Sequence, residues 1–245
     1  MNKKQQKIIT VDNVGEFRSI VWNKLRMVTP PDVDKRVLVY RFKHMERVSD
    51  ISYQLLCLYI DEYNKCKKKY NSKKTKISKS DYHQVKEIIE NDILTSVIFL
   101  GLIHDIYKFR ETDKVDHGVL ASEFFKNYCK NNKLKMTGIV KKMNEAVKHH
   151  SEKGRNYDNL YYKILVDADI LSKYTEENFK EKMIRSNITS REELLHLDNE
   201  ALKSYKPKTP FYEIVKFKYK SDLVSQMERG VFDALDKQIK EGRQK

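Results

Sequence analysis

Glycine and proline are scarce in this sequence, with 7 and 4 copies among 245 residues. A sandwich or barrel of short strands needs such residues at its many turns, so their scarcity favours helices. From Lys35 to Tyr63 apolar residues recur every three or four positions, the period of an amphipathic helix. The residues on that face are His44, Val48, Ile51, Leu55 and Leu58. The sequence therefore predicts an all-α fold in which His44 points inward.

The rest of the chain predicts one helical domain with peripheral helices at each end. Further helices are expected from Ser80, within the apolar stretch Ile93 to Ile106, and over residues 119–128, 135–150 and 161–174. Charged amphipathic pieces follow at 176–185 and 191–205. Prolines at 206–210 then break the pattern, and a final helix is expected over 222–240.

Composition and charge restrict the class of protein. Hydrophobic residues make up 40% of the chain, which is too high for a disordered protein. The longest apolar run is far shorter than the ~20 residues that span a bilayer, and no leader-like apolar segment follows the first residues. Three cysteines without a CxxC pair indicate neither a disulfide framework nor a zinc ribbon. These features predict a cytoplasmic protein without membrane insertion.

The formal net charge of +14 favours anionic partners such as nucleotides or nucleic acid. Lysine-rich coding in an AT-rich genome produces the same excess, so both origins stay open. Eight lysines and no acidic residue occur between Lys65 and Lys79. This segment is interpreted as a solvated loop between helices, with the backbone of a single-stranded nucleic acid as its alternative ligand.

The residues that suggest chemistry lie in apolar surroundings. His104 and Asp105 follow the most apolar segment, where burying a carboxylate beside an imidazole is costly without a cation. A divalent metal supplies that charge, because imidazole and carboxylate are its natural ligands. Asp167 and Asp169 add carboxylates from a second apolar helix. The pattern therefore indicates a metal site.

This order of residues resembles the HD-domain superfamily of metal-dependent phosphohydrolases. His44 matches the first histidine of the family, His104 and Asp105 match the His-Asp doublet, and Asp169 matches the final aspartate. Lys108 stands where many members have lysine, three residues after the doublet. Tyr107 stands where glycine is usual, which indicates a differently shaped turn.

Two further histidines, His117 and His150, resemble the additional ligands of members that hold two metals, among them small-nucleotide hydrolases and the HD-GYP phosphodiesterases. The Gly-Tyr-Pro motif of the latter group is absent. His149 is expected to be the exposed neighbour of His150. Asp167 is a less certain site residue that binds either a backbone amide or a ligand. His83 and His196 fit no part of the pattern and are expected at the surface.

The resemblance implies an HD domain over residues 37–205, with an extension over 1–36 packed on it and a C-terminal helical extension over 206–245. It also implies one or two divalent ions per chain, drawn from Mn, Fe, Ni, Co, Zn and Mg. His44, His104, Asp105 and Asp169 hold the first ion. If Asp105 bridges two ions, His117 and His150 hold the second; otherwise these two histidines contact phosphate.

The activity implied is hydrolysis of a phosphoester or phosphoanhydride bond in a nucleotide or nucleotide second messenger by metal-activated water. Asp105 would orient the water and take its proton, while Lys108 would offset charge on a phosphate oxygen. Two alternatives remain. One is an HD-type nuclease acting on single-stranded nucleic acid, and the other is a non-catalytic regulator that binds a nucleotide.

Overall fold

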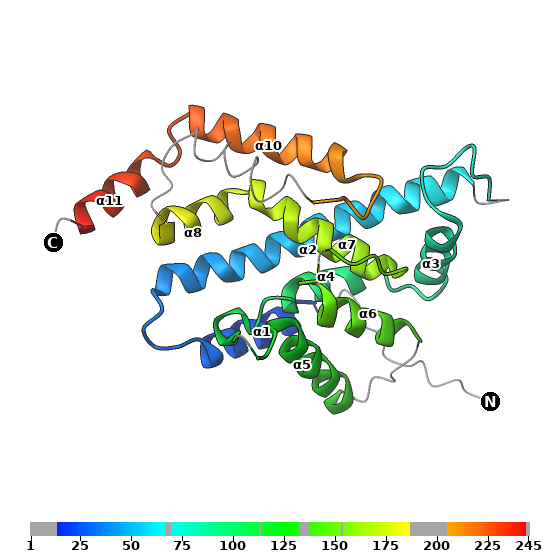
Figure 1. The fold of residues 1–245 in the computed structure, drawn as a ribbon, viewed down its shortest axis with the longest axis horizontal. Coiled ribbons are helices and arrows are strands. Elements are labelled where there is room, and N and C mark those ends of the chain that lie inside the picture. The colour runs from blue at the N-terminus through cyan, green and yellow to red at the C-terminus, as the bar shows by residue number, and fades with distance from the viewer. Residues whose placement is uncertain are drawn as a thin grey trace.

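The structure is a computed structural model that describes residues 14–66, 70–112, 114–132, 138–152, 154–186 and 205–243. Within these ranges the chain is helical, and its only extended pairing is an isolated bridge between Thr112 and Val115. The helices in chain order are α1 (Val14–Val28), α2 (Lys35–Lys65), α3 (Lys79–Glu90), α4 (Ser96–Ile103), η2 (Lys108–Arg110), α5 (His117–Asn131), α6 (Gly138–His149), α7 (Leu160–Leu171), η3 (Ser172–Tyr174), α8 (Glu176–Ser186), α10 (Tyr212–Glu228) and α11 (Asp233–Arg243) (Figure 1). The all-α prediction is confirmed.

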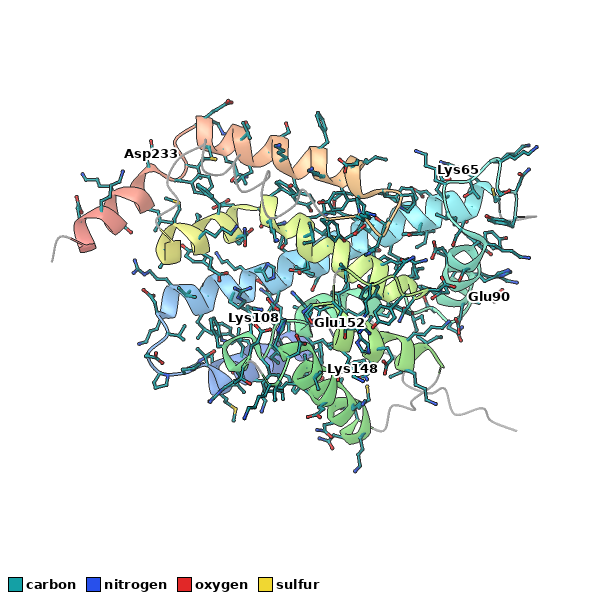
Figure 2. The ribbon with its side chains drawn as sticks, in the orientation of Figure 1. Lys65, Glu90, Lys108, Lys148, Glu152 and Asp233 are labelled. Carbon is teal, nitrogen blue, oxygen red and sulfur yellow. The ribbon has the colours of Figure 1, made fainter. Side chains whose placement is uncertain are left out.

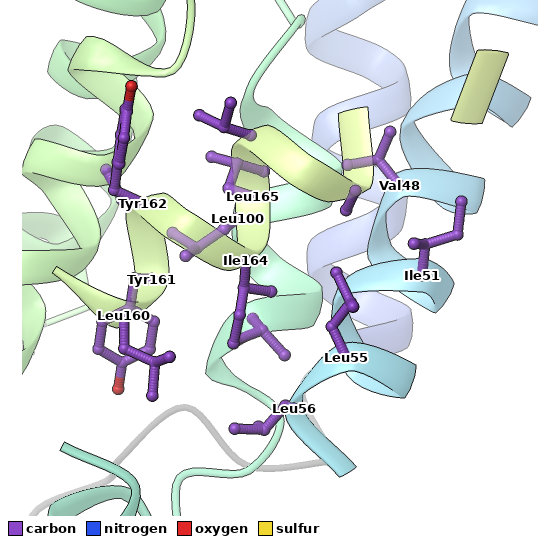
Figure 3. Close-up of a cluster of buried hydrophobic side chains, with 14 of the residues drawn as sticks. Val48, Ile51, Leu55, Leu56, Leu100, Leu160, Tyr161, Tyr162, Ile164 and Leu165 are labelled. Atoms are coloured by element: carbon purple, nitrogen blue, oxygen red, sulfur yellow. The ribbon is translucent and has the colours of Figure 1, made fainter. Parts of the chain in front are cut away.

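Helix α2 is the central helix of the fold, and α4, α7 and α8 all pack on it (Figure 1). It begins where the Asp34 side chain accepts a hydrogen bond from the Arg36 amide, which satisfies one of the unpaired donors of a helix start. Its inward face includes His44, as the periodicity predicts. Figure 3 shows apolar residues of α2, α4 and α7 meeting in this core: Val48, Ile51, Leu55, Leu56, Leu100, Ile164 and Leu165.

A glycine allows α4 to approach α2 closely. A Cβ atom on Gly101 would lie 2.4 Å from the Ser49 backbone nitrogen, well inside van der Waals contact. The Ser49 hydroxyl also donates to the Ile98 carbonyl at 2.9 Å, across the same interface. Because α4 ends immediately before His104, this contact positions the His-Asp doublet relative to α2.

Most predicted helices are present, with shifted ends. The apolar stretch Ile93 to Ile106 is buried, but it is helical only over α4, and α5 begins at His117. The prediction of a single helix over 222–240 is wrong, because α10 ends at Glu228 and α11 begins at Asp233. Gly230 separates them with φ of +70°, a conformation that glycine adopts without a Cβ clash. The amphipathic piece 191–205 lies outside the described residues, except for Tyr205.

The C-terminal helices have a second, smaller core. Phe179 and Met183 of α8 pack against Leu223 of α10 and against Phe232, apart from the main core. The domain limits 37–205 and 206–245, and the extension 1–36, stay predictions. Within the described part of the chain, no helix combines the length and apolarity that a bilayer crossing needs.

Gly101→Ala tests the close approach of α4 to α2. The added methyl group must displace backbone of Ser49, so we expect the free energy of unfolding to fall by about 1–3 kcal/mol in urea denaturation. Gly15→Ala in α1 is the control, because nothing lies within 4 Å of its added Cβ. Equal stability of the two variants would contradict the tight contact.

Candidate metal centre

Six side chains that the sequence singles out converge between α2 and the helices around it. His44 comes from α2, His104 and Asp105 from the turn after α4, and His117 from the first residue of α5. The remaining two are His150, directly after α6, and Asp169 of α7. The four histidines and Asp105 are buried, and Asp169 is nearly so.

The first group of ligand atoms surrounds one carboxylate oxygen of Asp105. His44 Nε2 lies 3.3 Å from His104 Nε2 and 3.5 Å from Asp105 Oδ2. Asp169 Oδ1 lies 3.6 Å from His44 Nε2 and 3.8 Å from His104 Nε2. Ligand atoms bound at about 2.1 Å to one cation are separated by roughly these distances. His44, His104 and Asp105 therefore fit a single divalent ion, and Asp169 Oδ1 lies within reach of both histidines beside them.

The second group surrounds the other oxygen of the same carboxylate. His117 Nε2 lies 3.0 Å from Asp105 Oδ1 and 3.0 Å from His150 Nε2. His150 Nε2 is 3.7 Å from that oxygen. Asp105 thus presents Oδ2 to one set of ligands and Oδ1 to another, as a carboxylate that bridges two ions does.

Hydrogen bonds at Nδ1 orient the imidazoles. His104 Nδ1 donates to the Gly101 carbonyl, and His150 Nδ1 donates to the Val147 carbonyl, each at 2.7 Å. His117 Nδ1 lies 2.8 Å from Glu111 Oε1, a carboxylate that can only accept.

His44 Nδ1 lies 3.0 Å from Ser172 Oγ. That hydroxyl donates its single proton to the Asp169 carbonyl, so it accepts from His44. In all four histidines the Nδ1 proton is accounted for, and in the neutral ring the Nε2 lone pair faces the cluster.

These lone pairs explain why the cluster suits a cation. In their neutral form, two imidazole Nε2 atoms at 3.0 or 3.3 Å cannot hydrogen-bond to each other, since each offers only a lone pair. Burial removes the water that would otherwise satisfy them. A divalent ion held by each pair together with Asp105 would satisfy these Nε2 lone pairs. The donor set is thus appropriate for metals that accept nitrogen and oxygen ligands.

The pKa shifts within the cluster indicate which of its groups are charged. Burial lowers the pKa of His104 to about 3, so that this ring is neutral at physiological pH. Burial opposes ionisation of Asp105, but the surrounding histidines, in the forms that carry a proton on Nε2, outweigh it and hold the Asp105 pKa well below its usual value. Burial also disfavours charge on His117, yet hydrogen bonds to Asp105 and Glu111 raise its pKa. A proton therefore competes with a metal ion at His117.

Five of the six cluster residues, all except His104, line a cavity of about 300 Å³. Lys108 lines this cavity, with its Nζ 2.6 Å from Glu111 Oε2. In the view of Figure 2, Lys108 lies just below α2. Glu111 thus contacts both Lys108 and His117, and sequence reasoning did not identify it. It follows α4 and η2 in irregular backbone, where no periodicity indicates which way a side chain points.

Arg41 is a second residue that sequence reasoning missed. Its Nη1 donates to Asp105 Oδ2 at 2.8 Å, and its Nη2 donates to Glu181 Oε1 at 2.5 Å. Arg41 precedes His44 by three residues on α2, so helical spacing puts the two on one face. This spacing is the sequence signal by which Arg41 could have been identified as a site residue.

The two less certain site residues lie outside the cluster. His149 contacts Glu152 Oε1 through Nδ1 at 2.6 Å and Glu145 Oε2 through Nε2 at 3.2 Å, at the partly exposed side of α6. Asp167 is buried but accepts hydrogen bonds from the backbone amides of Lys208 and Thr209.

The Asp167 carboxylate also accepts from the hydroxyls of Tyr205 and Thr209. Its two oxygens are therefore occupied by the segment before α10, which corresponds to the backbone-amide alternative. His83 is exposed, as predicted, and His196 lies outside the described residues.

A close contact between α5 and α6 brings the second group together. Asp116 accepts from the Gly118 amide at 2.7 Å and from the Ser151 hydroxyl at 2.8 Å, which joins the start of α5 to the end of α6. A Cβ on Gly118 would lie 2.8 Å from the Val147 carbonyl oxygen. Glycine directly after His117 therefore lets that histidine reach His150.

Calorimetric titration of the metal-free protein with Mn²⁺ tests the two groups. We expect two ions per chain for the unchanged protein and one ion for His117→Ala and for His150→Ala, because each variant removes a ligand of the second group only. Asp105→Ala should retain neither ion, since both groups lose their shared carboxylate. One ion per chain in the unchanged protein and in both histidine variants would contradict the second group.

Comparison with known proteins agrees with this geometry. Residues 80–199 match the family model of the HD domain. The match includes His104, Asp105, His117, His150 and Asp169, whereas His44 lies before it and is brought to the same cluster by the fold. Neither the curated proteins nor the solved structures gave a match. The matched residues and the all-α fold around them show that residues 80–199 of this chain belong to the HD-domain superfamily.

Proposed function

We propose that this protein is a metal-dependent phosphohydrolase that cleaves a phosphoester or phosphoanhydride bond of a nucleotide or a nucleotide second messenger. The observation that carries the proposal is the Asp105 carboxylate, whose two oxygens face two separate sets of buried ligand atoms. Two sets of ligand atoms that share a carboxylate can hold two ions. A pair of ions suits displacement at phosphorus, because the attacking and the leaving oxygen can both be neutralised.

The charges around the cavity support an anionic substrate. Its lining carries the cationic side chains of Arg41, Lys108 and Lys173 and the carboxylates of Asp105, Glu111 and Asp169. These charges balance when the histidines are neutral. Each divalent ion then adds two positive charges, which a phosphate-bearing ligand would compensate. A volume of about 300 Å³ is at the lower end of the range for small-molecule sites and supports a small nucleotide.

Different residues of the chain have different roles in the proposed reaction. The six cluster residues would hold the ions, and bound ions would supply Lewis-acid polarisation and lower the pKa of water toward about 7. Asp105 and Asp169 offer carboxylate oxygens that orient water and accept its proton. Lys108, held by Glu111 at the cavity wall, places a positive charge where a non-bridging phosphate oxygen would develop negative charge.

The lysine-rich segment gives the nuclease alternative little support. Lys65 ends α2, twenty-one residues after His44, which corresponds to about 30 Å along a helix. Lys65 and Lys108 are labelled well apart in Figure 2. The backbone amide of Lys76 in this segment is also bound to the protein, since it donates to Glu62 Oε2 at 3.1 Å. Nucleic acid therefore remains the second choice of substrate.

A hydrolysis panel with Mn²⁺-loaded protein tests the proposed function. The panel contains nucleoside monophosphates, dinucleoside polyphosphates, cyclic dinucleotides and labelled single-stranded oligonucleotides. We expect release of product from a small nucleotide and its loss in Asp105→Ala. Cleavage of oligonucleotides alone would establish the nuclease, and binding of nucleotide without any turnover would establish the regulator.

Lys108→Ala separates the phosphate contact from metal binding. We expect kcat to fall on the order of 10²-fold, because one charge-stabilising group is lost, while the number of Mn²⁺ ions bound is unchanged. Lys86→Ala is the control, since Lys86 pairs with Glu90 on the surface of α3. An unchanged kcat in Lys108→Ala would remove this lysine from the reaction.

A further inference from the structure

Two ion pairs join α8 to α2. Arg41 Nη2 lies 2.5 Å from Glu181 Oε1, and Arg47 Nη2 lies 3.3 Å from Glu177 Oε1. The two glutamates are four residues apart on α8, so they occupy successive turns of one face. Both pairs therefore hold the same two helices together.

Of these two ion pairs, only Arg41–Glu181 also contacts a residue of the metal centre. Arg41 Nη1 donates to Asp105 Oδ2 at 2.8 Å, so its guanidinium lies between the carboxylates of Asp105 and Glu181. The side chain of Arg41 is 12% exposed, that of Asp105 8% and that of Glu181 4%. Arg47 instead contacts Asp50 at 3.6 Å and is 35% exposed.

The oxygen that Arg41 contacts is the one that faces the first group of ligands. His44 Nε2 lies 3.5 Å from Asp105 Oδ2, and His104 Nε2 lies 3.7 Å from it. A guanidinium stays charged at every physiological pH. Its charge repels a cation bound nearby, and its hydrogen bond occupies an acceptor position of the same oxygen.

Glu181 opposes both effects of Arg41. Its carboxylate neutralises the guanidinium and fixes Nη2 on the side toward α8. Without that carboxylate, the whole charge of Arg41 would act on Asp105. Glu181 thus decides how strongly Arg41 competes with a metal ion, although it is not one of the clustered ligand residues.

We propose that Glu181 is a positioning residue of the metal centre, acting through Arg41 to keep Asp105 Oδ2 available to a divalent cation. The inference rests on the proposed metal-dependent function and adds to it a determinant on α8, outside the ligand set. It makes metal affinity depend on the contact between α8 and α2.

A double-mutant cycle measured by Mn²⁺ calorimetry tests the proposal. We expect Glu181→Gln to weaken Mn²⁺ binding about 10-fold or more, as removal of an outer-shell partner does. Arg41→Gln should bind Mn²⁺ at least as tightly as the unchanged protein, because the competing charge is gone. In the Arg41→Gln background, Glu181→Gln should then change the affinity less than two-fold.

Glu177→Gln is the matched control, because it removes the other ion pair between the same two helices. We expect its Mn²⁺ affinity to stay within two-fold of that of the unchanged protein. Thermal unfolding checks that each variant is folded. If Glu181→Gln does not fold, Glu181→Asp replaces it with the same expected direction, since the shorter side chain withdraws the carboxylate from Nη2.

Three outcomes would overturn the proposal. They are unchanged Mn²⁺ affinity in Glu181→Gln, an equal loss in Glu177→Gln, and a Glu181→Gln effect that persists without Arg41. The last would mean that Glu181 acts through its own charge. Absence of Mn²⁺ binding in the unchanged protein is a different result, because it would contradict the metal centre on which the inference rests.

Discussion

The buried carboxylate of Asp105 is the constraint on which the rest of the site depends. Burying an isolated charge costs far more than a folded domain can sustain, so its surroundings must compensate it. Arg41 supplies a permanent charge, and four imidazoles offer nitrogen atoms around the two oxygens. Interactions with these histidines hold the Asp105 pKa low despite burial, so the carboxylate is ionised and available to cations.

Close helix contacts make this concentration of polar groups possible. Gly101 lets α4 touch the backbone of α2 at Ser49, and Gly118 lets α5 touch the carbonyl of Val147 on α6. Each glycine is next to a candidate ligand or a few residues away from one. A larger side chain at either position would have to push the two helices apart, and the ligand atoms with them.

The sequence predicts those site residues whose position follows from helical periodicity. His44 shares a face with apolar residues of α2, and His150, unlike His149, follows the apolar side of α6. Periodicity also separates Asp167 from Asp169, since residues two apart on a helix point in nearly opposite directions. It does not predict which of the two faces the cluster, because that depends on where the segment 205–209 packs.

Contacts between distant segments lie beyond such reasoning. Arg41 has a visible spacing to His44, but its role in the site follows from its contacts with Asp105 and Glu181, which are 64 and 140 positions away in the sequence. Glu111 lies in irregular backbone without a period. The break between α10 and α11 depends on one glycine with positive φ, which a helical pattern of charged residues conceals.

The C-terminal helices are joined to the metal centre in two ways that differ physically. On α7, Asp167 is saturated by hydrogen bonds from the segment before α10, and the neighbouring Asp169 faces the ligands, so this connection is fixed by geometry. On α8 the connection is a shared charge, because Arg41 divides its guanidinium between Glu181 and Asp105. The apolar side chains of α8 pack in the small core and the helix also packs on α2, so its position sets that division of charge. The metal centre thus depends on α8 through electrostatics and on α7 through hydrogen-bonded geometry.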